Sequence, residues 1–441
     1  MIVHPLFTDR PSLLLFMVAD RLWLTDRLWS ETGIPGGTLS GSPCGAPFTD
    51  DGAAMDFRLT DEQQHLRDAA RKFAQAELPV LAKELEEKNE PVPADMMACY
   101  AALGYLGINL PEHYGGHGLS HLDAVIVLEE FAKVSPAVAF PVFESCFGPI
   151  LAIAHFAPEA LRKRLIPQVV AGKSIVAVAM SEPDAGSALT DLRTRATVRG
   201  QTVHLTGQKR WCSGAGHSDG YLVYCKMSED PGAAGIGAVY VEKGTKGFTF
   251  GKREQLMGFR GIASADMVFE DVQVPVDNVV VSAGGGFRKL KEAFDLERCG
   301  NATMSLAIAQ GALDYVLAYV QQRKQFGKPI VDFQAVQLRL ADMAMKIEAS
   351  RLLIYQAVWS ASEGLPSIQQ SSIAKCFANE MVREVTGHAL QMMGAYGYSK
   401  DFPIEQRMRD AWGWGIAGGA IDIQKTNIAS ALMGRRFDQR R

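Results

Sequence analysis

The stretch from Phe287 to Gly327, FRKLKEAFDLERCGNATMSLAIAQGALDYVLAYVQQRKQFG, decides the fold. Its apolar residues recur at three- and four-residue spacing, which predicts a helix that runs nearly unbroken from Phe287. Two further segments of the same kind follow, at 331–364 and 371–394. Three long consecutive helices predict an antiparallel bundle at the C-terminal end of the chain.

The remainder of the chain changes its hydrophobic period. Helical spacing extends from Met55 to about Gly172, and a period of two, broken by Gly, Asp and Pro, extends from Ser174 to about Val281. Helix, strand and helix in blocks argue against a doubly wound sheet. We predict a mainly α protein with a middle β domain. Its parts are an N-terminal helical domain (55–173), a middle domain (174–282) and a C-terminal helical domain (283–441).

Residues 1–54 have a different composition. The short apolar run PSLLLFMVA has acidic flanks, which suit neither a secretory signal nor an organellar transit peptide, and a Gly/Pro/Ser-rich stretch follows it. A helix start comes after Met55, where Thr60 and Gln63 have the spacing of a capping box. We expect translation to begin naturally at Met55, and the preceding segment to be disordered or a gene-start error.

Composition excludes several classes of function. The 441 residues carry a net charge of −4 with both signs mixed, so nothing indicates a nucleic-acid or membrane-surface partner. No run approaches the ~18 uninterrupted apolar residues of a spanning helix. The seven cysteines are scattered without CxxC spacing, which indicates reduced thiols in a reducing compartment and no metal site.

Glu297 is the strongest candidate for a catalytic residue. On its own face of the long helix the apolar residues are Leu290, Phe294 and Met304, and Asn301 is polar but uncharged. A carboxylate on an apolar stripe is desolvated, which raises its pKa and suits it to be a base near neutral pH. A structural ion pair with a nearby Lys or Arg is the equally weighted alternative.

Other polar or glycine-rich segments indicate little by themselves. GAGHSDG at 214–220 lies between strands with no helix after it, so it reads as a connecting loop and not as a dinucleotide fingerprint. SEPDAGS at 181–187 reads as a turn. WGWGIAGGAIDIQ at 412–424, with four glycines, predicts an open loop within the helical C-terminal third.

Taken in order, several blocks resemble one family. They are YGGHGLS, SEPDAGS, GQKRWCSGAG, LMGFRG, VFEDVQVP, RKQFGKPIVDFQAVQLRLADM, QMMGAYGYSKDFPIEQRMRDA and GGAIDIQ, each in its expected helical or strand region. From Met55 to its end the chain resembles the acyl-CoA dehydrogenases. The resemblance implies an N-terminal helical domain, a middle β-barrel and a C-terminal four-helix bundle.

The resemblance also implies a chemistry. Members bind FAD and an acyl-CoA thioester, usually as homotetramers built as dimers of dimers. A carboxylate removes the α-proton, the β-hydride goes to flavin N5, and the electrons leave to an electron-transfer flavoprotein. A cytoplasmic bacterial enzyme is the expected setting.

Site residues follow from the resemblance by position. Flavin contacts are expected at Val178, Ala179, Met180, Ser181, Ser187, Trp211, Cys212 and Ser213. Residues expected to reach the FAD of a neighbouring subunit are Arg323, Gln334, Gln391, Met392, Met393, Gly394 and Ala395, and Ala420 and Asp422 are further cofactor positions. Substrate contacts are expected at Ser187, Asp295, Arg298 and Gly418.

The sequence departs from the common family pattern in two places. WCSG replaces Trp-Ile-Thr-Asn, and GGAID replaces Glu-Gly-Thr-Ser-Glu/Gln, so Gly418 stands where most members have the catalytic glutamate. A subset similar to isovaleryl-CoA and long-chain dehydrogenases has a small residue there and its base in a DLER run. This chain has that run, with Glu297 as its acid. Two carboxylates at one α-carbon would repel, so one replaces the other.

The expected function is therefore FAD-dependent α,β-dehydrogenation of an acyl-CoA, with Glu297 as general base. Two alternatives stay open. One is a same-fold enzyme acting on a carrier-protein-bound acyl group, or as an enoyl-CoA reductase or desulfinase. The other is a non-catalytic partner subunit of a heteromeric dehydrogenase.

Overall fold

The computed structural model describes residues 58–362 and 364–437. The expectation about residues 1–54 and a start at Met55 lies outside these residues. Helix α1 (Asp61–Lys88) begins at the predicted capping box: the Thr60 hydroxyl accepts from the Gln63 N–H, and the Gln63 side chain accepts from the Thr60 N–H, both at 3.2 Å.

Five further helices complete the first helical part of the chain. They are α2 (Ala94–Ala102), α3 (His121–Val134), α4 (Pro136–Cys146), α5 (Ile150–Phe156) and α6 (Glu159–Val170), with the short 3-10 helix η1 (Glu112–Tyr114). Helix α4 is buried along its whole length, and the Ser135 hydroxyl caps its first turn by accepting from the Ala137 N–H. Every side of α4 therefore contacts protein.

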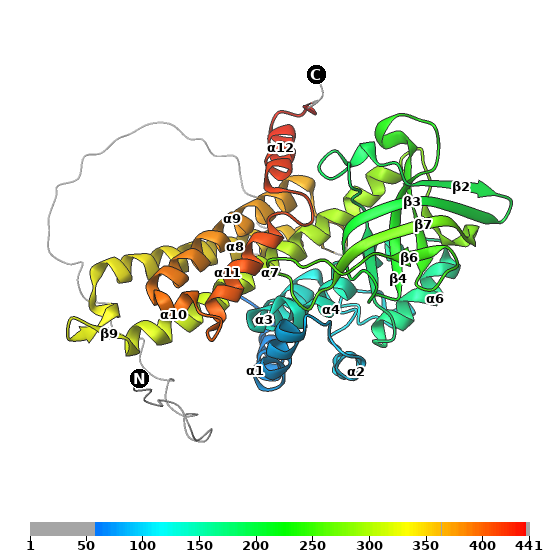
Figure 1. The fold of residues 1–441 in the computed structure, drawn as a ribbon. Helices are drawn as coiled ribbons and strands as arrows, with labels where there is room; N and C mark the ends of the chain where they lie inside the picture. Colours follow the sequence, from blue (N-terminus) through cyan, green and yellow to red (C-terminus); the bar gives the residue numbers. More distant parts are fainter. Residues whose placement is uncertain (1–57, 363, 438–441) are drawn as a thin grey trace, which may run out of the picture. The chain divides into compact units, whose positions relative to one another are not determined.

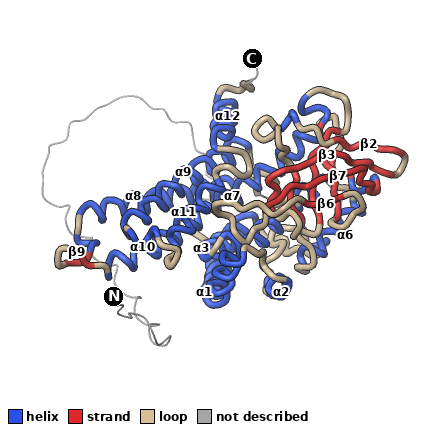
Figure 2. Tube along the Cα trace, viewed as in Figure 1, coloured by secondary structure: helices blue, strands red, loops and turns tan. Residues whose placement is uncertain are grey.

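The middle of the chain forms one mixed sheet (Figure 2). Its strands are β1 (Val176–Ala179), β2 (Arg195–Arg199), β3 (Thr202–Ser213), β4 (Gly220–Lys226), β5 (Ile236–Glu242), β6 (Phe248–Phe250), β7 (Ser264–Pro275) and β8 (Val279–Val281). The order is β6-β7-β3-β2-β4-β5-β8, and β1 runs parallel to β4, with Val176 opposite Gly220. Short 3-10 helices lie between strands: η2 (Leu189–Asp191), η3 (Gly232–Gly235) and η4 (Val276–Asn278).

Long helices return after the sheet (Figure 1). They are α7 (Gly286–Gln322), α8 (Gln334–Trp359), α9 (Ile368–Met393), α10 (Ala395–Tyr398), α11 (Pro403–Trp414) and α12 (Ile421–Leu432). A small hairpin of β9 (Lys324–Gln325) and β10 (Lys328–Pro329), then η5 (Ile330–Asp332), joins α7 to α8. Helix α7 packs against α3, α8, α9 and α11. The predicted fold class is confirmed, whereas the exact domain boundaries stay a prediction.

One predicted loop is wrong at both ends. Helix α11 extends through Trp414 and α12 begins at Ile421, so only 415–420 lies outside helix within the stretch 412–424. Gly413 lies within α11, and a Cβ at this position would lie 2.5 Å from the Phe259 ring. The close contact with Phe259 therefore explains why this helical residue is a glycine. This glycine serves close packing and not a turn.

Two segments, Pro136–Phe156 and Gly286–Gln322, are apolar and long enough to cross a membrane by length and composition alone. Of their most apolar windows, 94% and 67% are buried inside the protein, as in the core helices of globular proteins. Both segments are accounted for by core packing.

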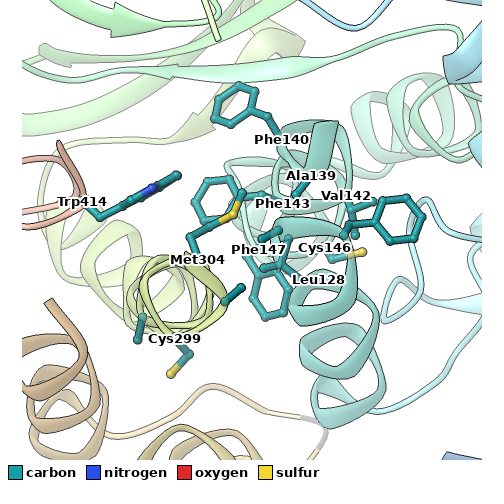
Figure 3. Packing of buried hydrophobic residues seen from close by; sticks show 14 of the residues in the cluster. Leu128, Ala139, Phe140, Val142, Phe143, Cys146, Phe147, Cys299, Met304 and Trp414 are labelled. Carbon is teal, nitrogen blue, oxygen red and sulfur yellow. The ribbon is translucent and has the colours of Figure 1, made fainter. Parts of the chain in front are cut away.

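A close helix contact in the core joins the end of α4 to α7 at Gly300. A Cβ on Gly300 would lie 2.6 Å from Cγ of Phe147 and 3.0 Å from Cε2 of Phe143. Figure 3 shows both rings between the two helices, with Trp414 beyond Phe143. The missing side chain allows α4 to approach α7 one turn after Glu297.

We predict that Gly300→Ala destabilises the protein by about 1–3 kcal/mol, because the added methyl group overpacks the α4–α7 contact. Gly387→Ala in α9 is the matched control. No atom lies within 4 Å of its Cβ position, so it should be neutral or stabilising by up to about 1 kcal/mol through helix propensity. Thermal unfolding followed by circular dichroism measures both variants, and equal unfolding midpoints would contradict the packing argument.

Candidate active site

The carboxylate of Glu297 lies unpaired in the middle of α7. Leu290, Phe294 and Met304 on its face are all buried, as expected. Among the described residues its oxygens form no hydrogen bond or ion pair, because the adjacent Arg298 pairs with Asp295. The structure therefore does not support the alternative that Glu297 forms a structural ion pair.

Burial changes the acidity of Glu297. Desolvation raises its pKa to about 8, and the positive charges of Arg298 and Lys375 partly oppose this rise. Glu297 is nevertheless half-buried and not fully buried, so part of the residue is still exposed to solvent. A carboxylate with a pKa near neutrality is well suited to accept a proton.

Two further titratable groups influence the same region. Glu144 of α4 is 5% exposed, and burial together with the Glu297 charge raises the pKa of Glu144 well above its ordinary value. Its Oε2 has no hydrogen-bond partner within the described residues. Tyr224 of β4 is buried, and burial and Glu297 raise its pKa. Burial therefore favours the neutral form of both groups.

The turn between α11 and α12 brings Gly418 beside this helix face. Gly418 and Gly419 have φ values of +65° and +88°, which favour glycine. A Cβ on Gly418 would lie 3.3 Å from Nδ2 of Asn301 and 3.5 Å from Cε of Lys375. Asn301 is one helical turn from Glu297, so a side chain at 418 would point toward the face that carries Glu297.

The expected flavin-contacting residues converge at β1 and the end of β3. β1 pairs with β4 on one side, so the peptide groups on its other edge are outside the described ladders. Trp211 has φ +62° and is 52% exposed, with the Arg210 guanidinium 4.4 Å from its ring centre. The thiol of Cys212 is buried in the sheet core, so Cys212 offers only its backbone.

This surface fits FAD by its chemistry. A flavin ring needs an aromatic or apolar platform and hydrogen-bonding groups along one edge, and here an exposed indole follows Arg210, whose backbone N–H donates to the Ser181 carbonyl after β1. Ser181 and Ser213 are half-buried and supply hydroxyls, whereas Ser187 is exposed in the turn after β1. These flavin contacts stay predictions.

A second group of predicted cofactor residues lies far from Glu297. Arg323 at the end of α7 stacks on the Tyr396 ring at 5.4 Å, and the Tyr319 hydroxyl donates to the Met393 carbonyl, so Arg323 and the 391–395 stretch lie together. At 1.5 Å per residue, Arg323 is about 39 Å along α7 from Glu297. One chain therefore does not bring these two groups of residues into one site.

The remaining predicted residues have mixed surroundings. Gln334 is exposed at the start of α8, and Asp422 is exposed in the first turn of α12, which Ala420 precedes. Asp295 is buried, pairs with Arg298 and accepts a hydrogen bond from Ser371 at 3.0 Å. This accounts for Asp295 structurally, so substrate contact by Asp295 or Arg298 stays a prediction.

Sequence reasoning missed a buried polar layer behind Gly418. Lys375, Asn301, Asn379 and Ser305 are joined by hydrogen bonds and are each at most 3% exposed. The available signal was the helical spacing of Ser371, Lys375 and Asn379 in a segment otherwise apolar on that face.

Family models match three consecutive parts of the chain. They are described as the acyl-CoA dehydrogenase N-terminal domain at 60–173, the middle domain at 177–272 and the C-terminal domain at 284–433.

Curated relatives extend over nearly the same span. A 3-sulfinopropanoyl-CoA desulfinase of Paraburkholderia xenovorans (strain LB400) is 39% identical, with 87% of this chain and 99% of that protein covered. An acryloyl-CoA reductase (NADH) of Anaerotignum propionicum is 38% identical, covering 86% and 97%.

A solved structure gives the same picture. Butyryl-CoA dehydrogenase from Megasphaera elsdenii matches with a TM-score of 0.82 and 34% identity, covering 86% of this chain and all of that one. With the helix–sheet–helix order and the Glu297 site, these matches show that the chain belongs to the acyl-CoA dehydrogenase family.

Proposed function

We propose that this protein introduces an α,β double bond into an acyl-CoA thioester. The supporting observation is the unpaired carboxylate of Glu297, whose pKa burial raises to about 8. Gly418, where common members have their acid, lies beside the next turn of the same helix face. The family's oxidoreductase chemistry and its FAD cofactor apply to this chain.

Glu297 takes the α-proton of the thioester in this scheme. The proton moves to a carboxylate oxygen, and the negative charge that develops on the thioester carbonyl oxygen needs a fixed hydrogen-bond donor. The peptide N–H of Gly418 supplies this donor. FAD, when bound against β1 and Trp211, supplies the hydride acceptor.

The neutral side chains around Glu297 support proton abstraction. Glu144 and Tyr224 are buried, and burial raises the pKa of each, which favours their neutral forms beside the base. Phe143 and Trp414, whose ring centres are 5.7 Å apart, exclude water on the α4 side. A dry surrounding strengthens the interaction between the developing charge and its donor.

The proposal includes a homotetramer built as a dimer of dimers. Helix α8 carries exposed Leu338, Met345, Leu352 and Trp359 at seven-residue intervals, a continuous apolar stripe that a second helix would cover. Because Arg323 and 391–395 lie far from Glu297, they are placed to complete the FAD site of a neighbouring subunit. Electrons pass to an electron-transfer flavoprotein, and the setting is a bacterial cytoplasm.

A second candidate function comes from the relatives. Proteins that are 39% and 38% identical over almost their whole lengths are named a 3-sulfinopropanoyl-CoA desulfinase and an acryloyl-CoA reductase (NADH). A same-fold desulfination, in which a 3-sulfinoacyl-CoA and water give the saturated acyl-CoA and sulfite, or the reverse reduction of an enoyl-CoA, is therefore the rival to dehydrogenation.

Glu297→Gln should lower kcat by about 10²–10⁴-fold, since the variant has no base but keeps the shape of the side chain. FAD content and acyl-CoA binding should remain. The matched control is Glu292→Gln, an exposed carboxylate on the same helix that faces Arg288 at 3.9 Å, and it should keep wild-type turnover. Steady-state assays with an artificial electron acceptor measure both, and full turnover by Glu297→Gln would refute the assignment.

The rate of flavin reduction should depend on pH through Glu297. A base must be ionised to act, so kcat/KM should rise about tenfold per pH unit below the pKa of about 8 and level off above it. Anaerobic stopped-flow mixing with acyl-CoA between pH 6 and 9 measures this dependence. A rate constant that does not change across this range would count against Glu297 as the base.

A substrate panel separates the two candidate functions. Saturated acyl-CoAs should bleach the flavin anaerobically, and 3-sulfinopropanoyl-CoA should release no sulfite. Sulfite release without flavin bleaching, or oxidation of NADH by acryloyl-CoA, would favour the second candidate. A colourless purified protein would instead indicate the non-catalytic subunit.

A further inference from the structure

Lys375 is a lysine buried without a carboxylate partner. It lies in α9 at 0% exposure, and within the described residues its ammonium forms no ion pair at 4.0 Å or less. A buried charge is costly unless it is paired or fully hydrogen-bonded. The hydrogen bonds of this side chain therefore have to account for its position.

All three N–H groups of Lys375 have an oxygen acceptor. Its Nζ donates to Oδ1 of Asn379 at 2.9 Å, to the Trp414 carbonyl at 3.1 Å and to the Ala417 carbonyl at 3.0 Å. A neutral amine has only two N–H groups, so one of the three oxygens would then face a lone pair. This arrangement favours the ammonium form.

Asn301 of α7 holds the same two carbonyls. Its Nδ2 lies 3.2 Å from the Trp414 oxygen and 3.3 Å from the Ala417 oxygen. Nδ2 of Asn379 in turn donates to Oδ1 of Asn301 at 3.1 Å and to Ser305 at 2.7 Å. The end of α11 is thus fixed from two helices at once, and these helix-terminal carbonyls attract positive charge.

The fixed carbonyls immediately precede Gly418. The Ala417 carbonyl belongs to the same peptide group as the Gly418 N–H, so a hydrogen bond to that oxygen sets the orientation of that N–H. A Cβ on Gly418 would be 3.5 Å from Cε of Lys375. Lys375 therefore controls the direction of the donor assigned to the thioester carbonyl.

Lys375 also acts electrostatically on Glu297. Its positive charge lowers the pKa of Glu297 relative to burial alone. Burial in turn lowers the pKa of Lys375 to about 7, and the three oxygen acceptors around Nζ oppose this loss of charge. The other charged or titratable groups that influence Glu297 are Arg298 on its own helix, Glu144 on α4 and Tyr224 on β4. Arg298 pairs with Asp295, whereas Lys375 has no such partner.

We infer that Lys375 is the positioning residue of this active site: its ammonium orients the Gly418 peptide and presents an uncompensated positive charge to Glu297. The inference rests on the proposed function, because it takes Glu297 and Gly418 as base and donor. One residue thereby links proton abstraction to carbonyl polarisation. If Lys375 only joined the helices of the bundle, its substitution would lower the stability of the protein and would not change the pH at which Glu297 titrates.

Lys375→Gln tests the inference with a side chain that keeps amide donors but has no charge. In the FAD-loaded enzyme the pH at which Glu297 titrates should rise by about one unit, a tenfold fall in its ionised fraction at pH 7. Infrared spectroscopy of the protonated carboxyl band measures this pH, and the band is assigned by its absence in Glu297→Gln. The kcat should fall at least tenfold at pH 7 with KM little changed.

Two companion variants sharpen the result. Asn301→Ser removes the second clamp and keeps the charge, so kcat should fall while Glu297 titrates as in the wild type. Lys346→Gln, an exposed lysine that contacts Glu384 of α9, is the matched control and should change neither quantity. If Lys375→Gln yields no folded protein, Asn379→Asp is the substitute test. It places a carboxylate beside Nζ of Lys375, which compensates the positive charge and should raise the pH at which Glu297 titrates.

The inference is overturned if Glu297 titrates at the same pH in Lys375→Gln as in the wild type, or if only KM changes. The infrared measurement needs no turnover, so it decides the electrostatic role even if the proposed dehydrogenation fails. Conversely, dehydrogenation with an unshifted Glu297 would keep the proposed function and remove Lys375 from it.

Discussion

Helix α7 has to be buried on nearly every side and still carry an ionisable side chain in its middle. Its segment 293–313 is in contact with α3, α4, α9 and α11, and Glu297 is within it. Water cannot solvate a carboxylate there as it does at a surface, so the neighbouring helices must provide either charges or neutral, dry surroundings. The side-chain chemistry of α4, α9 and the α11–α12 turn follows from this single requirement.

Each neighbouring helix meets the requirement differently. Helix α4 offers aromatic rings that approach α7 closely at Gly300, so the surroundings on this side are apolar. Helix α9 offers the ammonium of Lys375 and the amide of Asn379, which are hydrogen-bonded to one another, to the backbone at Ala417 and to Asn301 of α7. Arg298, next to the base in sequence, is paired with Asp295 and is not available as a direct partner. The outcome is a carboxylate with a pKa near neutrality.

Local sequence periodicity was sufficient for the long helices, for most strands and for Glu297. Leu290, Phe294 and Met304 mark the face of α7 in the sequence itself, because helix geometry is local. Helical spacing marks Lys375 as one of a row of polar residues on α9, but its partners could not be found in this way, since two of its three acceptors are backbone carbonyls about 40 residues away whose position depends on tertiary packing. Gly413 was assigned to a loop for a related reason. Its lack of a side chain leaves room for the ring of Phe259, which is distant in the sequence, so the sequence around Gly413 does not show why glycine is present. Residues that reach a neighbouring subunit's cofactor stay predictions, because a single chain does not form that site.

The proposed placement of the base on α7, with Gly418 on a turn, has a consequence for how such enzymes diversify. In an enzyme whose base stands on the 415–420 turn, any change in that turn moves the reactive carboxylate. Here the carboxylate is anchored in a helix that makes contacts over its whole length, and the turn contributes only a peptide group. Substitutions at Ala417 and Ala420 are therefore free to reshape the space offered to the acyl group while the proposed geometry of proton transfer is conserved. The two tasks can evolve separately, which suits a scaffold shared by relatives with different reactions.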